Sequence, residues 1–388
     1  MDDTLSYIRI STMDFTSKSI ELTKSLSKIE KKNNGIFFTP KTARDQVFEL
    51  LDKHQVDPTT ILEPSFGSGE FLDDLYLLYP ESEITGVEKC QKLYEAVEYP
   101  NTHNIDFMDY QGKHDLIIGN PPFVVIPQTP DTMKCQTSRP NLFVQFIWNS
   151  LEKHLNSGGY LAFILPTAFY NCSYYEKMRK YLFDHTTVLE VKALECKYLE
   201  TQQDTFVLLL KNQKGKNDKF VLINNCHYLT PFYSELNTLL KKSTTLSKLG
   251  FTVNTGQVVW NQEKDKLADT GIILVYSSNF KSGNIEFPKM TGEKKQYITG
   301  FKKPPLTGKS ILVNRGYGNS YSLNCVIVDY AEYYAENHVN VIRGPDELIN
   351  TVLQSLRGKN TELFIQYFVG NGALSKTEIE CCLPIWLT

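Results

Sequence analysis

The first half of the chain alternates short apolar runs with amphipathic segments, and this alternation constrains the fold more than any other feature. Residues 83–87, 115–118 and 160–165 are apolar runs of strand length. The segments 70–79 and 142–155, each shortly before a strand, repeat apolar side chains at helical spacing. Strands that alternate with helices in this way predict an α/β domain with a doubly wound, largely parallel sheet.

The same pattern continues to about residue 211. A helix is expected over residues 174–183, followed by strands over residues 187–191 and 205–210, and an earlier short strand ends at Leu62. In sheets of this kind, ligands bind beyond the carboxyl ends of the strands. Polar residues and glycines that directly follow a strand are therefore the first candidates for a binding site.

The hydrophilic run 211–219 is the best domain boundary. A chain of 388 residues is long enough for two domains. Beyond the run, short β-like segments lie between Gly- and Asn-rich turns, and helices follow late, over residues 345–356 and 361–368. We therefore predict domains over residues 1–215 and 216–388, of which the second is an α+β domain.

The composition indicates an intracellular globular protein. Hydrophobic residues make up 41% of the chain and charged residues 22%, and no apolar run is long enough to cross a bilayer. The N-terminal residues lack the apolar segment of a signal peptide and instead predict a helix over residues 14–31. The eight cysteines and seven histidines are scattered without metal-ligand spacing. We expect reduced thiols, a cytoplasmic location, no membrane partner and no metal.

The strongest chemical signal is Asn120-Pro121-Pro122-Phe123, directly after the strand at residues 115–118. The amine of a purine is a poor nucleophile because its lone pair is delocalised into the ring. The side-chain oxygen of Asn120 and the carbonyl of Pro121 could accept hydrogen bonds from both N–H groups and turn the lone pair outward. The two prolines would hold these acceptors in place, and Phe123 could stack on the base. The plain alternative is a strand followed by a proline turn.

Three further segments support this interpretation, and the first two follow expected strands. Gly67 and Gly69 come after the first strand and would let the backbone approach a ligand closely. Glu88, after the next strand, could accept hydrogen bonds from both hydroxyls of a ribose. Asp106 could accept one from an adenine amine, and Phe107 could cover the ring. Seen alone, Glu88 is as well explained as a helix cap, and Phe107 as a core aromatic.

Taken in order, these motifs resemble those of the gamma-type adenine-N6 DNA methyltransferases of restriction–modification systems, over roughly residues 35–211. The resemblance implies a Rossmann-like, S-adenosylmethionine-dependent catalytic domain over residues 1–215 and a target-recognition domain over residues 216–388. It implies a site-specific enzyme that methylates N6 of adenine in double-stranded DNA, with S-adenosyl-L-methionine as cofactor. A cognate restriction endonuclease would act separately.

In this family a Phe-Phe-Thr-Pro motif, here residues 37–40, precedes the Gly-containing loop, and an Asn-Leu-Phe helix start, here residues 141–143, closes over the cofactor. Thr39 and Pro40 would line the methionine pocket together with Glu63. By this resemblance the full set of cofactor contacts would be Thr39, Pro40, Glu63, Pro64, Gly67, Gly69, Glu88, Asp106, Phe107, Asn120 and Leu142.

The family also stacks the flipped base between two aromatic side chains. Phe123 would supply one and replaces the tyrosine often found there, which keeps the stacking and loses a hydroxyl hydrogen bond. Tyr198 lies at about the right distance before the strand at residues 205–210 to supply the other. Leu199 is a competing register, and its side chain cannot stack.

A base inside a duplex must be swung out to reach such a site, and a separate domain must then read the sequence. Between residues 281 and 315, basic residues outnumber acidic ones by eight to two, against a net charge of −3 for the whole chain. The alternative for this stretch is a solvated loop, and the alternative for residues 315–319 is an ordinary hairpin. The candidate DNA-binding residues in and just after it are Lys294, Lys295, Lys302, Lys303, Arg315, Tyr317 and Asn319.

Two other functions remain open. RNA-base and protein-glutamine N-methyltransferases use the same Asn-Pro-Pro-aromatic motif, but the long C-terminal domain and residues 37–40 favour DNA. A non-catalytic DNA-binding or specificity module could keep a degenerate cofactor fold. Binding alone does not require Asn120, Glu88 and Asp106 together, which favours an enzyme.

Overall fold

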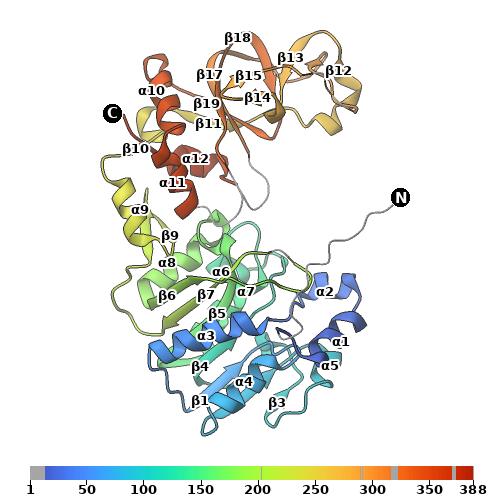
Figure 1. Cartoon of the computed structure of the whole chain (residues 1–388), viewed down its shortest axis with the longest axis vertical. Helices are drawn as coiled ribbons and strands as arrows, with labels where there is room; N and C mark the ends of the chain where they lie inside the picture. Colours follow the sequence, from blue (N-terminus) through green and yellow to red (C-terminus); the bar gives the residue numbers. More distant parts are fainter. Residues whose placement is uncertain are drawn as a thin grey trace. The chain divides into compact units, whose positions relative to one another are not determined.

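The computed structural model describes residues 14–201, 203–288, 290, 292–315, 322–368 and 373–387. The chain divides into two compact units, each described here by itself (Figure 1). The first unit runs to Val221 and includes residues 226–231, and the second includes residues 222–225 and continues from Phe232. The boundary predicted between residues 215 and 216 precedes this division, because strands β8 (Phe220–Ile223) and β9 (Cys226–Leu229) still pair with each other beyond it.

The first unit is built on a seven-stranded sheet in the order β3-β2-β1-β4-β5-β7-β6. Its strands are β1 (Thr60–Glu63), β2 (Glu83–Val87), β3 (Thr102–His103), β4 (His114–Gly119), β5 (Leu155–Pro166), β6 (Thr187–Ala193) and β7 (Thr205–Lys211). Neighbours from β3 to β5 are parallel, whereas β7 is antiparallel to both β5 and β6. The predicted α/β fold is confirmed, and the sheet is mixed because β6 connects to β7 without a crossover helix.

The strand order reverses between β1 and β4. The chain moves outward from β1 to β2 and β3, and β4 then returns to the other side of β1. At such a switch point the loops that follow the two strands diverge and leave a crevice for ligands. Glu63 ends β1 and Gly119 ends β4, so the segments that begin at Pro64 and Asn120 start from the same edge of the sheet.

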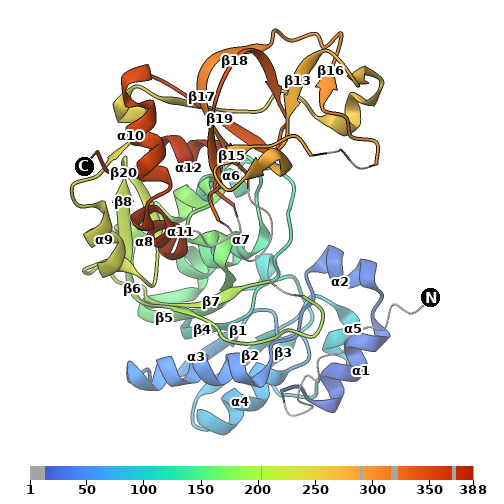
Figure 2. The same cartoon turned by 45° about the horizontal axis from the view of Figure 1, so that its top comes forward.

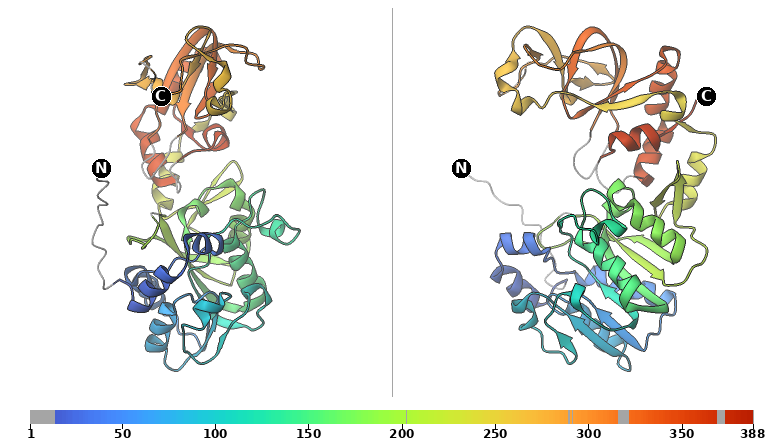
Figure 3. Two further views of the ribbon diagram at one scale, coloured as in Figure 1. Left: turned by 90° about the vertical axis from the view of Figure 1, so that its right-hand side faces the viewer. Right: turned by 180° about the vertical axis from the view of Figure 1, so that it is seen from behind.

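Helices cover both faces of this sheet. One face carries α3 (Lys41–Lys53) and α4 (Glu70–Leu78), in front in Figure 1, and the other carries α7 (Leu142–Asn149) and α8 (Glu176–His185), in front in the rear view of Figure 3. Ile61 and Leu116 pack in the core under α3 and α4, and the next residues, Leu62 and Ile117, pack in the core under α7 and α8. Because both faces are buried, the central strands β4, β5 and β7 contain unbroken apolar runs at residues 116–118, 160–165 and 206–210.

The N-terminal helix expected over residues 14–31 is in fact two helices, α1 (Ser17–Ser25) and α2 (Lys28–Asn34). The Ser27 side chain accepts a hydrogen bond from the Glu30 N–H, and the Glu30 carboxylate accepts one from the Ser27 N–H. This reciprocal pair is a capping box, which starts a new helix at Lys28 instead of continuing the first.

The helix expected over residues 142–155 is shorter than predicted. A π-helical turn over Ser150–His154 follows α7, and β5 already begins at Leu155. The register of β4 and β5 then shifts, since His114 pairs with Leu155 but Leu116 pairs with Tyr160. The Gly-rich segment in between is a bulge within the sheet.

The second unit is an α+β domain with its own seven-stranded sheet, in the order β11-β19-β17-β18-β13-β16-β12. Its strands are β11 (Thr252–Thr255), β12 (Leu267–Ala268), β13 (Ile272–Val275), β16 (Tyr297–Ile298), β17 (Leu306–Asn314), β18 (Cys325–Ala335) and β19 (Val339–Arg343). Pairs are antiparallel except that β13 runs parallel to β18. Helix α10 (Asp346–Leu356) packs against β17 and β18 (Figure 2).

The remaining elements are short or peripheral. In the first unit they are α5 (Gln91–Tyr94), beside α1 in Figures 1 and 2, and α6 (Thr132–Cys135). In the second they are α9 (Tyr233–Leu240), α11 (Lys359–Phe368), α12 (Lys376–Cys381), and the pairs β10 (Thr244–Thr245) with β20 (Pro384–Ile385) and β14 (Phe280–Lys281) with β15 (Asn284–Ile285). Within the described ranges, none of the helices combines the length and apolar character that a bilayer span requires.

Candidate active site

A cavity of about 580 Å³ lies at the carboxyl ends of the first four strands. This volume is within the range of small-molecule sites, about 300–1,000 Å³. Its walls come from the segments after β1 to β4, from the end of α2 and from α7. The predicted site residues that line it are Pro64, Gly67, Glu88, Asp106, Phe107, Asn120, Pro122 and Leu142. Those outside its lining are Thr39, Pro40, Glu63, Gly69, Pro121, Phe123 and Tyr198.

The loop after β1 turns through two glycines in the left-handed region. Gly67 has a φ of +56°, and Gly69, the N-cap of α4, has a φ of +85°. Other residue types rarely adopt this backbone conformation. A side chain on Gly69 would also lie 3.1 Å from Val97. The predicted Gly-containing loop is therefore a real turn, and Gly67 brings its backbone to the cavity wall.

Glu88 is held rigidly on the opposite side of this turn. One carboxylate oxygen accepts a hydrogen bond from the Gly67 N–H at 3.0 Å, and the other accepts one from the Cys90 N–H at 2.7 Å. Burial raises the pKa of Glu88, and these backbone hydrogen bonds offset the effect only in part. The carboxylate thus binds the N–H of the N-cap residue of α5 and also lines the cavity, and its contact with a ribose stays a prediction.

Asp106 and Phe107 form the next part of the wall. Asp106 accepts a hydrogen bond from the Met108 N–H at 3.0 Å and forms an ion pair with Lys89 at 2.7 Å, and Lys89 also lines the cavity. Phe107 is buried, and its ring centroid lies 4.7 Å from that of Phe146. Phe107 is thus a core aromatic whose remaining surface faces the cavity.

Glu63 lies behind the wall with one oxygen unpartnered. The carboxyl is fully buried, and its Oε1 accepts a hydrogen bond from the Ser65 N–H at 3.1 Å. Its Oε2 has no hydrogen-bond partner among the described residues. Burial raises the pKa of Glu63 well above its usual value. Only a glycine fits at Gly119, since a Cβ there would collide with this carboxyl group.

Asn120 has a defined orientation. Its Nδ2 donates to Thr39 Oγ1 at 3.1 Å and to the carbonyl oxygen of Phe37 at 3.4 Å. Its Oδ1 is buried and has no partner among the described residues. An amide oxygen accepts hydrogen bonds only, so a buried acceptor is left free beside the cavity that Asn120 lines.

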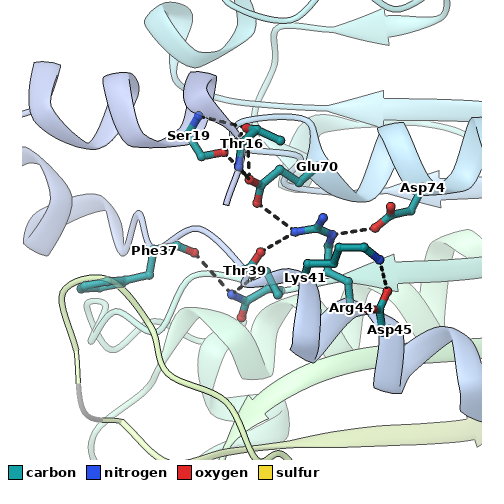
Figure 4. A network of polar contacts seen from close by, with 10 residues as sticks. Thr16, Ser19, Phe37, Thr39, Lys41, Arg44, Asp45, Glu70 and Asp74 are labelled. Carbon is teal, nitrogen blue, oxygen red and sulfur yellow. Dashed lines mark hydrogen bonds and ion pairs between the residues drawn. The ribbon is translucent and has the colours of Figure 1, made fainter. Parts of the chain in front are cut away.

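Thr39 and Pro40 lie outside the cavity lining and contact residues that surround the site. Pro40 is the N-cap of α3, and Thr39 is buried with its carbonyl oxygen 2.6 Å from Arg44 Nη1, which donates to it (Figure 4). The structure therefore brings Thr39 to Asn120, and the methionine-pocket contact expected for Thr39 and Pro40 is not part of the cavity lining.

The two predicted stacking aromatics lie away from the cavity lining. Phe123 is half-buried, and its ring meets that of Phe143 edge-on at 5.8 Å. Tyr198 is 8% exposed, and its hydroxyl lies 3.1 Å from Thr205 Oγ1. Tyr198 lines a second, much smaller space with Phe37. The structure thus does not bring Tyr198 to the cavity that Asn120 lines.

Several lining residues were not expected from the sequence. Gly35, which ends α2 with a φ of +65°, carried a visible signal, because glycine often follows the last turn of a helix. Phe146 is one turn after Leu142 and shares its face of α7. The others are Asn33, Asn34, Ile36, Ser65, Lys89, Cys90, Leu93, Val124 and Ile126. In the described part of the chain, no group of His, Cys, Asp and Glu residues is arranged to hold a metal ion.

The predicted DNA-binding residues of the second unit differ in their surroundings. Lys294 lies over the rings of Trp260 and Tyr276, and Lys295 forms an ion pair with Asp269 at 3.0 Å. Lys302, Lys303 and Arg315 are exposed. Tyr317 and Asn319 lie outside the described residues.

The comparisons with known proteins agree with this geometry. A family model described as "Eco57I restriction-modification methylase" matches residues 10–198. The "Type II methyltransferase M.CvrRI" of Paramecium bursaria Chlorella virus XZ-6E is 30% identical to the chain over 386 residues, which covers 94% of this chain and 98% of the relative. The "Modification methylase CviBIII" of Paramecium bursaria Chlorella virus NC1A is 29% identical, with 93% and 96% covered.

A solved structure shows the same fold. The structure of the Type IIL restriction-modification enzyme MmeI in complex with DNA matches with a TM-score of 0.56 at 12% identity and covers 92% of this chain and 68% of that one. Similarity at this level of identity concerns the fold alone. The family is shown instead by the match to M.CvrRI, which covers 94% of this chain and 98% of that relative at 30% identity. The chain therefore belongs to the restriction–modification methyltransferases, which are S-adenosylmethionine-dependent DNA methyltransferases.

Proposed function

We propose that this chain is a site-specific DNA methyltransferase that transfers the methyl group of S-adenosylmethionine to N6 of an adenine in double-stranded DNA. One observation carries the proposal: the Oδ1 of Asn120, at the cavity wall, is buried and has no hydrogen-bond partner in the described part of the chain. A buried acceptor without a partner is costly. Its presence is explained if the amino group of a substrate base supplies the missing donor.

The cavity suits S-adenosylmethionine, whose bound form supplies a methyl group activated on a positively charged sulfur. Its cationic amine needs an anion, and the candidate is Glu63 behind the cavity wall, whose buried Oε2 has no partner among the described residues. Its ribose needs acceptors, which Glu88 offers on the cavity wall, and its adenine needs an apolar face and a polar edge, which Phe107 and Asp106 offer. The turn at Gly67 leaves room for close backbone approach.

Asn120 and Pro121 would act on the target base. The Asn120 side-chain oxygen and the Pro121 carbonyl would each accept a hydrogen bond from the exocyclic amine, which localises the lone pair on nitrogen for methyl transfer. Both acceptors are fixed in advance, because two hydrogen bonds hold the Asn120 amide and a second proline stiffens the loop. The contribution is electrostatic preorganisation, and no general base is required to start the transfer.

The target adenine would be flipped out of the duplex, because a stacked base cannot reach the end of a sheet. Phe123 and Tyr198 would stack on its two faces, a contact worth about 1–3 kcal/mol per base. Tyr198 is buried and bound to Thr205. Its ring would therefore have to move out of this buried position before it could stack on the base.

The second unit would be the target-recognition domain, which gives the chain the gamma-type order with the catalytic unit first. Lys302 and Lys303 are exposed neighbours on a loop and are suited to phosphate contact. Arg315, also exposed, follows β17 and could reach a base edge. A cognate endonuclease would cleave the unmethylated form of the same site.

The proposal is tested by replacing Asn120 with Ala. We expect no detectable transfer to duplex DNA, while the Kd for S-adenosylmethionine in calorimetry stays near that of the parent, because Asn120 serves the base. Asn217→Ala is the matched control, since this half-buried amide bonds to backbone groups at Phe183, Thr186 and Val188 in the same unit. Full activity of Asn120→Ala would reject the assignment.

A further inference from the structure

The Asn120 amide is useful to a substrate amine only in one of its two orientations. An amide can turn by half a revolution with little change in shape, because its terminal torsion is roughly two-fold. In the wrong orientation, Nδ2 would point two N–H groups at an incoming amine, which is itself a donor. Something in the protein must therefore select the orientation that leaves Oδ1 free.

We infer that Thr39 is a positioning residue for the transfer reaction, which fixes the Asn120 amide from behind the cavity wall. Its hydroxyl accepts the shorter of the two hydrogen bonds from Nδ2, 3.1 Å against 3.4 Å for the Phe37 carbonyl. The Phe37 carbonyl only accepts, so a turned amide would place two oxygens against each other. The Thr39 hydroxyl therefore holds the Asn120 amide in place, and the Phe37 carbonyl selects the orientation in which Nδ2 faces it. This inference rests on the proposed role of Asn120.

Thr39 is itself held by Arg44. This side chain is buried, and its Nη1 donates to the Thr39 carbonyl at 2.6 Å and to Glu70 Oε2 at 3.1 Å (Figure 4). Its Nε donates to Asp74 at 2.6 Å. The guanidinium group therefore ties the backbone that carries the Thr39 hydroxyl to two carboxylates of α4.

The same network reaches the cofactor loop and the N-terminal helix. Glu70 is the first residue of α4, directly after the turn at Gly69. Its Oε1 accepts hydrogen bonds from the Thr16 N–H at 3.1 Å, from the Thr16 hydroxyl at 3.2 Å and from the Ser19 hydroxyl (Figure 4). The turn at Gly67 and Gly69, proposed to bind the cofactor, and the Asn120 amide, proposed to bind the base, are thus connected by one network of buried polar contacts.

The activity test compares Thr39→Val, which removes the hydroxyl at nearly constant volume, with Thr39→Ser, which keeps it. We expect Thr39→Val to lower the single-turnover rate of methyl transfer at saturating cofactor and DNA by about 10- to 100-fold, because the acceptor is no longer fixed. We expect the Kd for S-adenosylmethionine to stay within about threefold, and Thr39→Ser to recover most of the rate. An unchanged rate in Thr39→Val would overturn the inference.

A matched control separates positioning from general damage. Thr186 is another buried threonine of the first unit, and its hydroxyl donates to the Leu182 carbonyl at 2.7 Å. Thr186→Val makes the same chemical change away from the cavity, and we expect it to transfer at the parent rate. If Thr39→Val instead raised the Kd for S-adenosylmethionine by about 10- to 100-fold while the single-turnover rate at saturating cofactor and DNA stayed normal, Thr39 would be a cofactor contact. The positioning role would then be wrong.

A second readout does not depend on activity. In protein labelled with ¹⁵N at asparagine, the side-chain NH₂ signal of Asn120 is identified by its loss in Asn120→Ala. We expect slow solvent exchange of this signal in the parent and in Thr39→Ser, and faster exchange in Thr39→Val. An unaltered signal in Thr39→Val would refute the contact even if the parent transferred its methyl group to something other than adenine, so the two proposals fail separately.

Discussion

Replacing Arg44 with Met removes the positive charge that binds Glu70 and Asp74 and keeps most of the side-chain volume. Arg44 and Glu70 have side chains only 5% and 3% exposed. Removing one partner of a buried ion pair costs about 3–5 kcal/mol, because it leaves an uncompensated charge. Thr16 and Ser19 would still donate to Glu70, and Asp74 is 19% exposed and can be hydrated. We therefore expect a loss near the lower end, about 3 kcal/mol of unfolding free energy.

The double variant Arg44→Met/Glu70→Gln shows whether the charge is the cause. A glutamine oxygen can still accept from Thr16 and Ser19, but it carries no charge. We therefore expect the double variant to regain about 1–2 kcal/mol relative to Arg44→Met alone, a coupling of the size seen between groups in direct contact. Glu70→Gln alone should be destabilising, since it weakens the bond from Arg44.

The assay must report on the first unit, because the two units can unfold separately. The chain has three tryptophans, and Trp148 in α7 belongs to the first unit, whereas Trp260 and Trp386 belong to the second. Urea unfolding followed by fluorescence in a Trp260→Phe/Trp386→Phe background isolates the Trp148 signal. A loss below about 1 kcal/mol for Arg44→Met, or a double variant no more stable than the single one, would refute the reasoning.

Two further predictions concern the ligands. Cofactor affinity should fall as the pH is lowered, because burial raises the pKa of Glu63 and the neutral acid cannot pair with a cationic amine. The fall should begin at a higher pH than the one at which an exposed glutamate becomes protonated. In calorimetry, Glu63→Gln should bind the cofactor weakly and with a flatter pH profile, and an equal pH dependence of the Kd in both proteins would contradict the pairing. Replacing Lys302 and Lys303 with Ala should weaken DNA binding for all sequences and lower its salt slope by about 2; an unchanged slope in a salt titration would remove these lysines from the interface.

The local part of the site could be predicted because strand ends are visible in the sequence. Pro64, Gly67, Glu88 and Asn120 each follow an expected strand, and parallel pairing of those strands brings them to one edge of the sheet. Asp106 follows no apolar run, and the roles of these residues in cofactor binding were implied by the resemblance to the methyltransferase family and stay predictions.

The rest depends on contacts between distant segments, which a single sequence does not reveal. A Cβ on Gly35 would lie 2.9 Å from the Pro122 side chain and 2.7 Å from Val124, so α2 packs directly against the Asn-Pro-Pro-Phe loop. The hydrogen bond from Asn120 to Thr39 is of the same kind. The family resemblance also implied that Tyr198 stacks on the base, but a resemblance in sequence does not show whether this loop residue is buried.

The most direct test of the central claim is to incubate the protein with unmethylated plasmid and S-adenosylmethionine and to map modified bases by single-molecule sequencing. The account predicts N6-methyladenine at one recurring short sequence with the parent protein, and none with Asn120→Ala. Methyl groups on cytosine, or a methylation pattern that survives the loss of the Asn120 amide, would contradict it.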